Sequence, residues 1–189
     1  MDIKYWDGGL ERHEIDAIKK IENVLSPQNV QKQKSANKGQ GFEALQVLKK
    51  SFNEGWKGYA GFRFVNKHKQ GEIDLLIVTH CNILIVELKH WNGKPVTSNR
   101  GKWFWGNEDR GKSPVEVTRN KEFLLRNLLK PFAGKFSNAN FTPRVYSLVV
   151  MTGNSNFSGL NQKELAETLS LNDFCKLCTN QKLFNERFD

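Results

Sequence analysis

Apolar residues recur at helical spacing in the first part of the chain. Those between residues 11 and 25 are three or four positions apart, which predicts an amphipathic helix over 11–25. The polar and basic stretch of residues 28–41 predicts a loop. A second apolar stripe then predicts a helix over residues 41–52, which Gly55 and Gly58 end.

Strand-like patterns follow in three segments. Residues 59–65 alternate in part between polar and apolar side chains. Residues 74–79 and 83–89 are almost continuously hydrophobic and rich in β-branched residues, which is typical of strands that helices cover on both faces. Because only residues 80–82 separate these two strands, we expect a tight antiparallel hairpin.

The second half of the chain returns to helices around one more strand. Turn signals in residues 90–112 predict a small hairpin. Ser113 is expected to cap the next helix and to form a capping box with Glu116, and the helix should end before Pro131. Residues 144–151 predict a buried strand, and two short helices close the chain. This order indicates a mixed α/β domain.

Length and composition favour one folded domain spanning residues 1–189. The chain is 38% hydrophobic and 26% charged, which excludes a disordered or fibrous protein. It has no apolar run long enough for a membrane span, and its first residues lack the apolar core of a secretory signal. Three cysteines cannot build a disulfide scaffold, so we expect a reducing, cytoplasmic location.

The charge balance points toward an anionic partner. Lys and Arg number 29 and Asp and Glu 20, which gives a net charge of +9 and a pI near 9.5. Nucleic acid is the first partner to consider for such a chain. The alternative is a solvated surface on which the extra lysines only aid solubility.

Asp74, Glu87 and Lys89 are the residues best suited to chemistry. Glu87 and Lys89 are two positions apart on one predicted strand, so their side chains leave the same face. Asp74 begins the preceding strand and shares that face if it lies opposite Glu87 or Lys89. This register requires a two-residue loop, His80-Cys81 or Cys81-Asn82, or an equivalent bulge, because a one-residue slip reverses the face.

Two carboxylates and an ammonium group on one face suit metal-assisted phosphodiester hydrolysis. Mg²⁺ binds protein carboxylates together with waters and substrate phosphate. Asp74 and Glu87 would supply the carboxylates, and the Leu88 carbonyl would be a third ligand. Lys89 would hold the attacking water and balance developing charge. A Glu-x-Lys pair can also be a plain surface ion pair, but a carboxylate within an apolar hairpin needs a metal or lysine partner.

The segments GEIDLLIV, ILIVELKHWNGK and SPVEVTRN together resemble the nuclease-related domain (NERD) family of the PD-(D/E)xK restriction-endonuclease-like superfamily. The similarity covers residues 39–153. Its most specific part is the run formed by Glu87, Lys89, Trp91 and Gly93. The resemblance implies an α/β fold with a mixed central sheet flanked by helices. Residues 1–38 would add an N-terminal helix and a basic loop, and residues 154–189 would add C-terminal helices.

The same resemblance implies cleavage of nucleic acid, usually DNA, with Mg²⁺ or alternatively Mn²⁺. On that pattern Asp74 and Glu87 bind the metal and Lys89 serves the attacking water. Glu43 matches the acidic position of the family's first helix, where it would contact the metal through water. Its alternative is an exposed helix glutamate favoured by the helix dipole.

One position departs from the family pattern. Related domains carry a glutamine shortly after the proline that starts the next helix, whereas this chain has Val117. The role of that glutamine would be missing or would move to Thr118 or Asn120. The other candidate contacts with nucleic acid are Lys38, His90, Lys102 and Lys121.

Cysteine and tryptophan clusters have plainer interpretations. Cys175 and Cys178 form a lone CxxC without the further pair that a zinc site needs, so packing in the core is favoured. Trp103 and Trp105 beside Lys102 would suit base stacking, but closing a hairpin over a core is the commoner role.

The sequence therefore predicts a metal-dependent endonuclease that acts on nucleic acid, with DNA favoured over RNA as the substrate. The rival is a non-catalytic nucleic-acid-binding or regulatory module that keeps the fold without turnover. A sugar hydrolase built on Asp74 and Glu87 fits the basic charge less well. We expect nucleic acid as the partner, no membrane contact, and association as a homodimer or with a helicase or defence-system protein.

Overall fold

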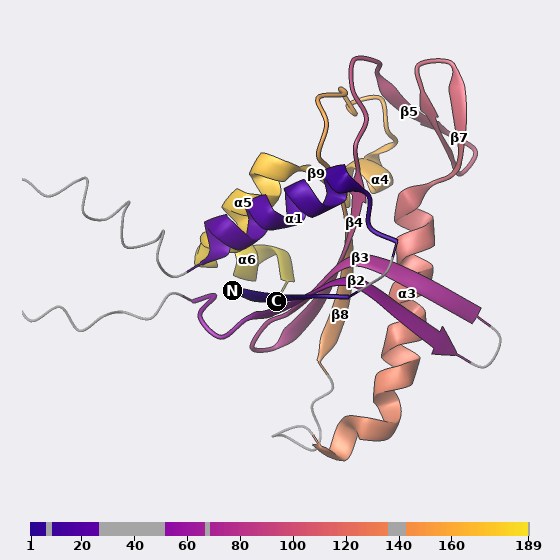
Figure 1. Cartoon of the computed structure of the whole chain (residues 1–189). Helices are drawn as coiled ribbons and strands as arrows, with labels where there is room; N and C mark the ends of the chain where they lie inside the picture. The colour runs from indigo at the N-terminus through magenta and orange to yellow at the C-terminus, as the bar shows by residue number, and fades with distance from the viewer. Residues whose placement is uncertain (7–8, 27–51, 67–68, 136–142, 189) are drawn as a thin grey trace, which may run out of the picture.

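The structure is a computed structural model that describes residues 1–6, 9–26, 52–66, 69–135 and 143–188 (Figure 1). Within them, a six-stranded sheet has the order β1-β2-β3-β4-β8-β9. Its strands are β1 (Asp2–Tyr5), β2 (Lys57–Asn66), β3 (Lys69–Val78), β4 (Asn82–Lys89), β8 (Arg144–Met151) and β9 (Thr168–Ser170). The β2–β3 and β3–β4 pairs are antiparallel and the others are parallel, so the sheet is mixed, as the resemblance implies.

A smaller sheet and five α-helices complete the described part of the chain. The smaller sheet is antiparallel and consists of β5 (Val96–Asn99), β6 (Lys102–Trp105) and β7 (Glu108–Lys112). The helices are α1 (Arg12–Leu25), α3 (Pro114–Leu129), α4 (Gln162–Ala166), α5 (Leu171–Thr179) and α6 (Gln181–Phe188), with a 3₁₀ helix at Lys130–Lys135. None of the described helices has the length and apolar character needed to cross a bilayer.

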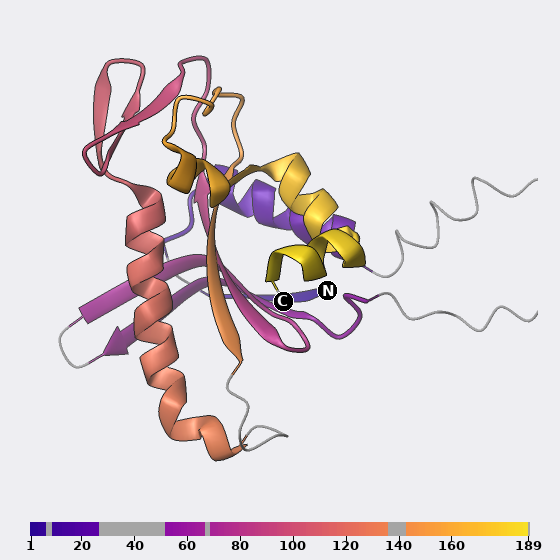
Figure 2. The same ribbon diagram turned by 180° about the vertical axis from the view of Figure 1, so that it is seen from behind.

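Helices cover both faces of the central sheet (Figures 1 and 2). One face packs against α1, α5 and α6 through a core that includes Ile18, Leu84 and Phe174. The opposite face packs against α3 through side chains such as Ile85 and Leu125. The central strand β4 is consequently buried along its length, apart from its partly exposed last residue. This confirms the two-sided cover expected from its continuous hydrophobicity.

The small sheet stands beside the start of α3, at the end of the central sheet where β4 finishes (Figure 1). Trp103 is fully buried there and packs with Val96, Val115 and Met151. Trp105 is partly buried, with Arg110 4.7 Å from its ring centroid. The core interpretation is therefore confirmed for Trp103, and the predicted hairpin over residues 90–112 is in fact three-stranded.

The predicted boundaries of helices and strands agree best with the structure for elements that pack in the core. The helix over residues 11–25 and the strand over residues 144–151 are both present. The strand predicted at 74–79 is the second half of the longer β3. The short strands β1 and β9 and a third C-terminal helix were not expected. The helix predicted over 41–52 lies outside the described residues, apart from Phe52 in a turn.

The capping box predicted at Ser113 is wrong. The Ser113 side chain makes no cap hydrogen bond, and its buried hydroxyl has no partner among the described residues. The residue is fixed instead by its backbone, because its N–H donates to the Gly101 carbonyl at 2.9 Å. A capping box does form at the start of α1, between Glu11 and Glu14.

Candidate active site

The β3–β4 hairpin has the register that the sequence requires. The Thr79 N–H donates to the Asn82 carbonyl at 2.9 Å, so the loop contains only His80 and Cys81. The pairs from Val78↔Ile83 to Leu75↔Val86 follow from this loop. Asp74 and Glu87 are the next residues of the two strands beyond the last pair, and they are near enough for the charge of Glu87 to act on Asp74.

Asp74 is held against β4 by a backbone hydrogen bond. Its Oδ2 accepts from the Leu88 N–H at 2.7 Å, and the carboxylate is buried. No cation within the described part of the chain forms an ion pair with it. Asp74 is thus a buried carboxylate with a fixed orientation and no direct counter-ion there.

Glu87, in contrast, is held between two lysines. Its Oε1 lies 2.8 Å from Lys89 Nζ, and its Oε2 lies 2.5 Å from Lys121 Nζ. Lys89 comes from the same strand, whereas Lys121 comes from α3. Asp74, Glu87 and Lys89 therefore lie close together where the hairpin ends, with an additional ammonium group from α3.

The electrostatics of the two carboxyl groups diverge. Burial raises the pKa of Asp74 to about 7, and the neighbouring charge of Glu87 adds to the effect. Burial would also raise the pKa of Glu87, but Lys89 and Lys121 outweigh it and hold that pKa below its ordinary value. Burial would lower the pKa of the Lys89 ammonium, but the contact with Glu87 raises it. Two groups with opposed protonation behaviour in one site are typical of functional centres.

The start of α1 lies close to this site and brings an acid that the sequence did not indicate. The His13 ring lies 4.9 Å from the His90 ring, measured between centroids, next to the end of β4. Glu14, one residue further, is near enough for its charge to raise the pKa values of Asp74 and Lys89. Helical periodicity reveals which face of α1 is buried, but not the place where the helix docks.

The family follows from a comparison with known domains. A family model described as the nuclease-related domain (NERD) matches residues 35–152, which is more than half of the chain. The chain belongs to the NERD family. The matched residues include the hairpin with Asp74, Glu87 and Lys89, and the resemblance drawn from the sequence is confirmed. A comparison with the curated proteins gives no match for this chain.

The other residues predicted to contact nucleic acid or metal differ in their surroundings. His90 is exposed beside Lys89, and its ring nitrogens lie 3.1 Å from Thr152 Oγ1 and 3.0 Å from Asn92 Nδ2. Lys102 is on the small sheet, paired with Asp109 at 2.6 Å. Lys38 and Glu43 lie outside the described residues.

Neither candidate for the lost glutamine role reaches the carboxylates. Thr118 is buried, and its hydroxyl donates to the Pro114 carbonyl at 2.7 Å, which satisfies it within the helix. Asn120 is exposed. The residue of α3 that does reach the site is Lys121, which the sequence suggested only as a contact for nucleic acid.

The donor set of this NERD site fits a hard divalent cation. Asp74 and Glu87 provide two adjacent carboxylates, the number that Mg²⁺ commonly takes from a protein. The raised pKa of Asp74 shows that a positive charge beside it would relieve an unfavourable burial. Among the described residues no larger cluster of His, Cys, Asp and Glu is suited to a metal. The remaining ligands would then be waters, substrate oxygens and the Leu88 carbonyl.

The CxxC pair is part of the core. Cys175 and Cys178 are buried against α1, and burial raises the pKa of both thiols. Thiols of this kind are poor nucleophiles and poor metal ligands. The packing interpretation is confirmed.

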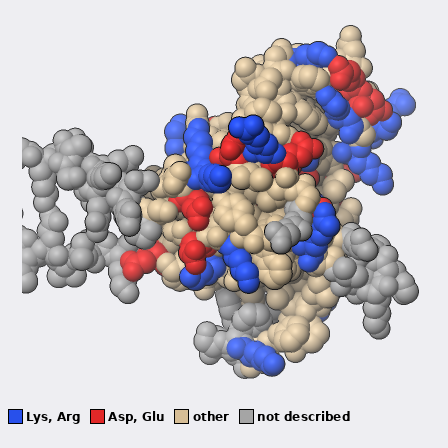
Figure 3. All heavy atoms as spheres, in the orientation of Figure 1, with Lys and Arg blue, Asp and Glu red and all other residues tan. Residues whose placement is uncertain are grey.

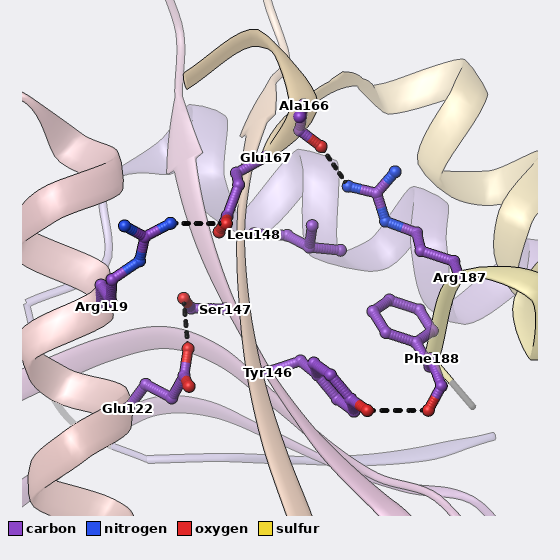
Figure 4. Close-up of a pocket in the computed structure, with 9 residues that line it drawn as sticks. All are labelled: Arg119, Glu122, Tyr146, Ser147, Leu148, Ala166, Glu167, Arg187 and Phe188. Carbon is purple, nitrogen blue, oxygen red and sulfur yellow. Dashed lines mark hydrogen bonds and ion pairs between the residues drawn. The ribbon is translucent and has the colours of Figure 1, made fainter. Parts of the chain in front are cut away.

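A separate pocket of about 370 Å³ lies beyond β8, between α3 and the end of the chain (Figure 4). Its charged side chains are already engaged, because Arg119 pairs with Glu167 at 2.6 Å and Arg187 donates to the Ala166 carbonyl at 2.6 Å. The Ser147 hydroxyl donates to Glu122 in the same way. None of the predicted site residues line this pocket.

Proposed function

We propose that this NERD-family chain is a metal-dependent endonuclease with a restriction-endonuclease-like core. It would hydrolyse the phosphodiester bonds of nucleic acid, with DNA as the favoured substrate. The observation that carries the proposal is the pair of buried carboxylates, Asp74 and Glu87, facing each other across a hairpin with Lys89 beside them. The family match supports a nuclease-like function.

Each residue would have a distinct role. Asp74 and Glu87 would hold Mg²⁺ or Mn²⁺, and the Leu88 carbonyl would complete the protein ligands. A bound divalent ion neutralises a phosphate oxygen and makes a coordinated water acidic. Lys89 would donate hydrogen bonds to the attacking water and oppose the charge that develops on phosphorus. Glu43, which matches an acidic position of the family pattern, would contact the metal through water.

The surface supports binding to a polyanion without strong sequence preference. The net charge is +9, and Figure 3 shows Lys and Arg side chains distributed over the visible face between smaller groups of Asp and Glu. Contacts of this kind reach the phosphate backbone and carry little base information. A protein of this type would act on many sequences.

The second candidate function is a nucleic-acid-binding module without turnover. Two observations favour it: both Glu87 oxygens are engaged by lysines, and Val117, at the family's glutamine position, is an exposed apolar side chain. Such a module would bind DNA in a salt-dependent manner and leave it intact.

Nuclease assays separate the two candidates. Supercoiled plasmid, linear duplex, single-stranded DNA and RNA would be incubated with Mg²⁺, Mn²⁺ or EDTA. Wild type should cleave at least one substrate only with metal, and Glu87→Ala and Lys89→Ala should slow cleavage by roughly 100-fold or more. Lys130→Ala, at an exposed residue just after α3, is the matched control and should cleave normally. Cleavage that survives EDTA or either substitution would refute the mechanism, and binding without cleavage would favour the module.

A further inference from the structure

Lys121 lies inside the carboxylate site rather than on the outer surface of α3. Its side chain is 15% exposed, whereas that of Lys89 is 26% exposed. The two ammonium groups approach the two oxygens of one carboxylate, Glu87, from different elements. The second lysine is therefore the more deeply placed of the two.

The pairing of charges in the site distinguishes this second lysine, because both lysines contact the same carboxylate, that of Glu87. The charges of Asp74 and Glu14 act on Lys89 from further away. The other carboxylate, Asp74, is not among the ion pairs of the described residues. Lys121 is thus a partly buried cation that shares the carboxylate of Glu87 with Lys89. An ammonium group that is shielded from water and loses its anionic partner carries a desolvation cost. If Glu87 binds another cation, Lys121 therefore needs a different anion nearby.

We propose, building on the nuclease function above, that Lys121 is a phosphate-binding residue that Glu87 holds in place until substrate arrives. A divalent cation held by Glu87 would compete with Lys121 for this carboxylate and would weaken the Lys121–Glu87 ion pair. Because its side chain is only 15% exposed, the Lys121 ammonium group would stay within the site, where a substrate phosphate oxygen would be the anion that replaces Glu87. Lys121 therefore competes with the cation for Glu87 and contributes to substrate binding.

The first test is metal binding without nucleic acid. Mn²⁺ would be titrated calorimetrically into wild type, Lys121→Gln, the charge-preserving Lys121→Arg and the control Lys130→Gln. Removing a cation from beside Glu87 should tighten Mn²⁺ binding roughly threefold to tenfold in Lys121→Gln. Lys121→Arg and Lys130→Gln should remain near wild type. Weaker Mn²⁺ binding in Lys121→Gln would overturn the competition.

The second test measures binding of a fluorescein-labelled DNA duplex in Ca²⁺ at several salt concentrations. Loss of one phosphate contact should lower the slope of log affinity against log salt by about 1 in Lys121→Gln and leave it unchanged in Lys121→Arg. A lysine that only stabilises the fold would leave the slope at the wild-type value, and that result would refute the inference. Wild type that binds the duplex but never cleaves it would refute the endonuclease proposal and leave the phosphate contact of Lys121 standing.

Discussion

The buried position of Asp74 makes the substitution Asp74→Asn a prediction about stability as well as activity. The pKa of this carboxyl is raised from 3.8 to about 7 in the folded protein, by burial first and by Glu87 second. The unfolded chain therefore loses the proton at lower pH than the folded chain. The stability that the protonated carboxyl contributes is lost as pH rises from about 4 to about 7. Above about pH 7 the effect of this group on stability no longer changes with pH.

The size of this effect follows from the pKa difference. At 1.36 kcal/mol per pKa unit, a change from 3.8 to about 7 corresponds to about 4 kcal/mol at pH 8. The same relation gives about 2 kcal/mol at pH 5. The amide of Asn carries no charge, and its oxygen can still accept the Leu88 N–H. In metal-free protein, Asp74→Asn should therefore be more stable than wild type, by a margin that grows by about 2 kcal/mol between pH 5 and pH 8.

Urea unfolding in EDTA at pH 5 and pH 8 measures this margin, since groups unaffected by the substitution cancel between the two proteins. Asp109→Asn is the control. Asp109 is exposed, and the hydrogen bond from Lys102 lowers its pKa, so its substitution should not stabilise the protein. A margin for Asp74→Asn that is equal at both pH values, or that becomes smaller at pH 8, would refute the reasoning.

Three further predictions test the site and its support. Mn²⁺ should raise the melting temperature of wild type more at pH 8 than at pH 5, and Asp74→Asn should lose most of that increase; equal increases in both proteins would contradict a site at this carboxylate. Leu84→Ala, at a fully buried position of β4, should cost about 2–5 kcal/mol in urea unfolding, whereas a loss below 1 would contradict the core. Gly153→Ala would place its Cβ 2.0 Å from the Trp91 carbonyl oxygen, so it should lower thermal stability and disturb the segment after Lys89; an unchanged melting temperature would contradict that packing.

The hairpin could be predicted from sequence because its register has few alternatives. A strand has a side-chain period of two, so the short loop after Val78 fixes which residues share a face with Glu87. Continuous hydrophobicity along β4 also predicts helices on both sides. These local rules were sufficient to predict that Asp74, Glu87 and Lys89 lie close together.

The parts of the site that come from helices could not be predicted in this way. Lys121 is a polar residue of α3, and periodicity alone cannot distinguish a lysine that faces solvent from one that reaches a buried glutamate. Glu14 has the same difficulty, because its position depends on the docking of α1. The short strands β1 and β9 contain too few residues for a clear pattern and form because a sheet edge is available. Ser113 occupies the predicted N-cap position before Pro114, but its side chain makes no capping hydrogen bond, and its N–H is bonded to the small sheet at Gly101.

The most direct test of the proposed chemistry compares DNA cleavage by wild type and Asp74→Asn at saturating Mg²⁺, with both proteins shown to be folded. If Asp74 holds the cation, the substituted protein should be the more stable of the two when metal is absent and yet cleave at least about 100-fold more slowly. Cleavage at close to the wild-type rate by Asp74→Asn would contradict a metal centre at this carboxylate.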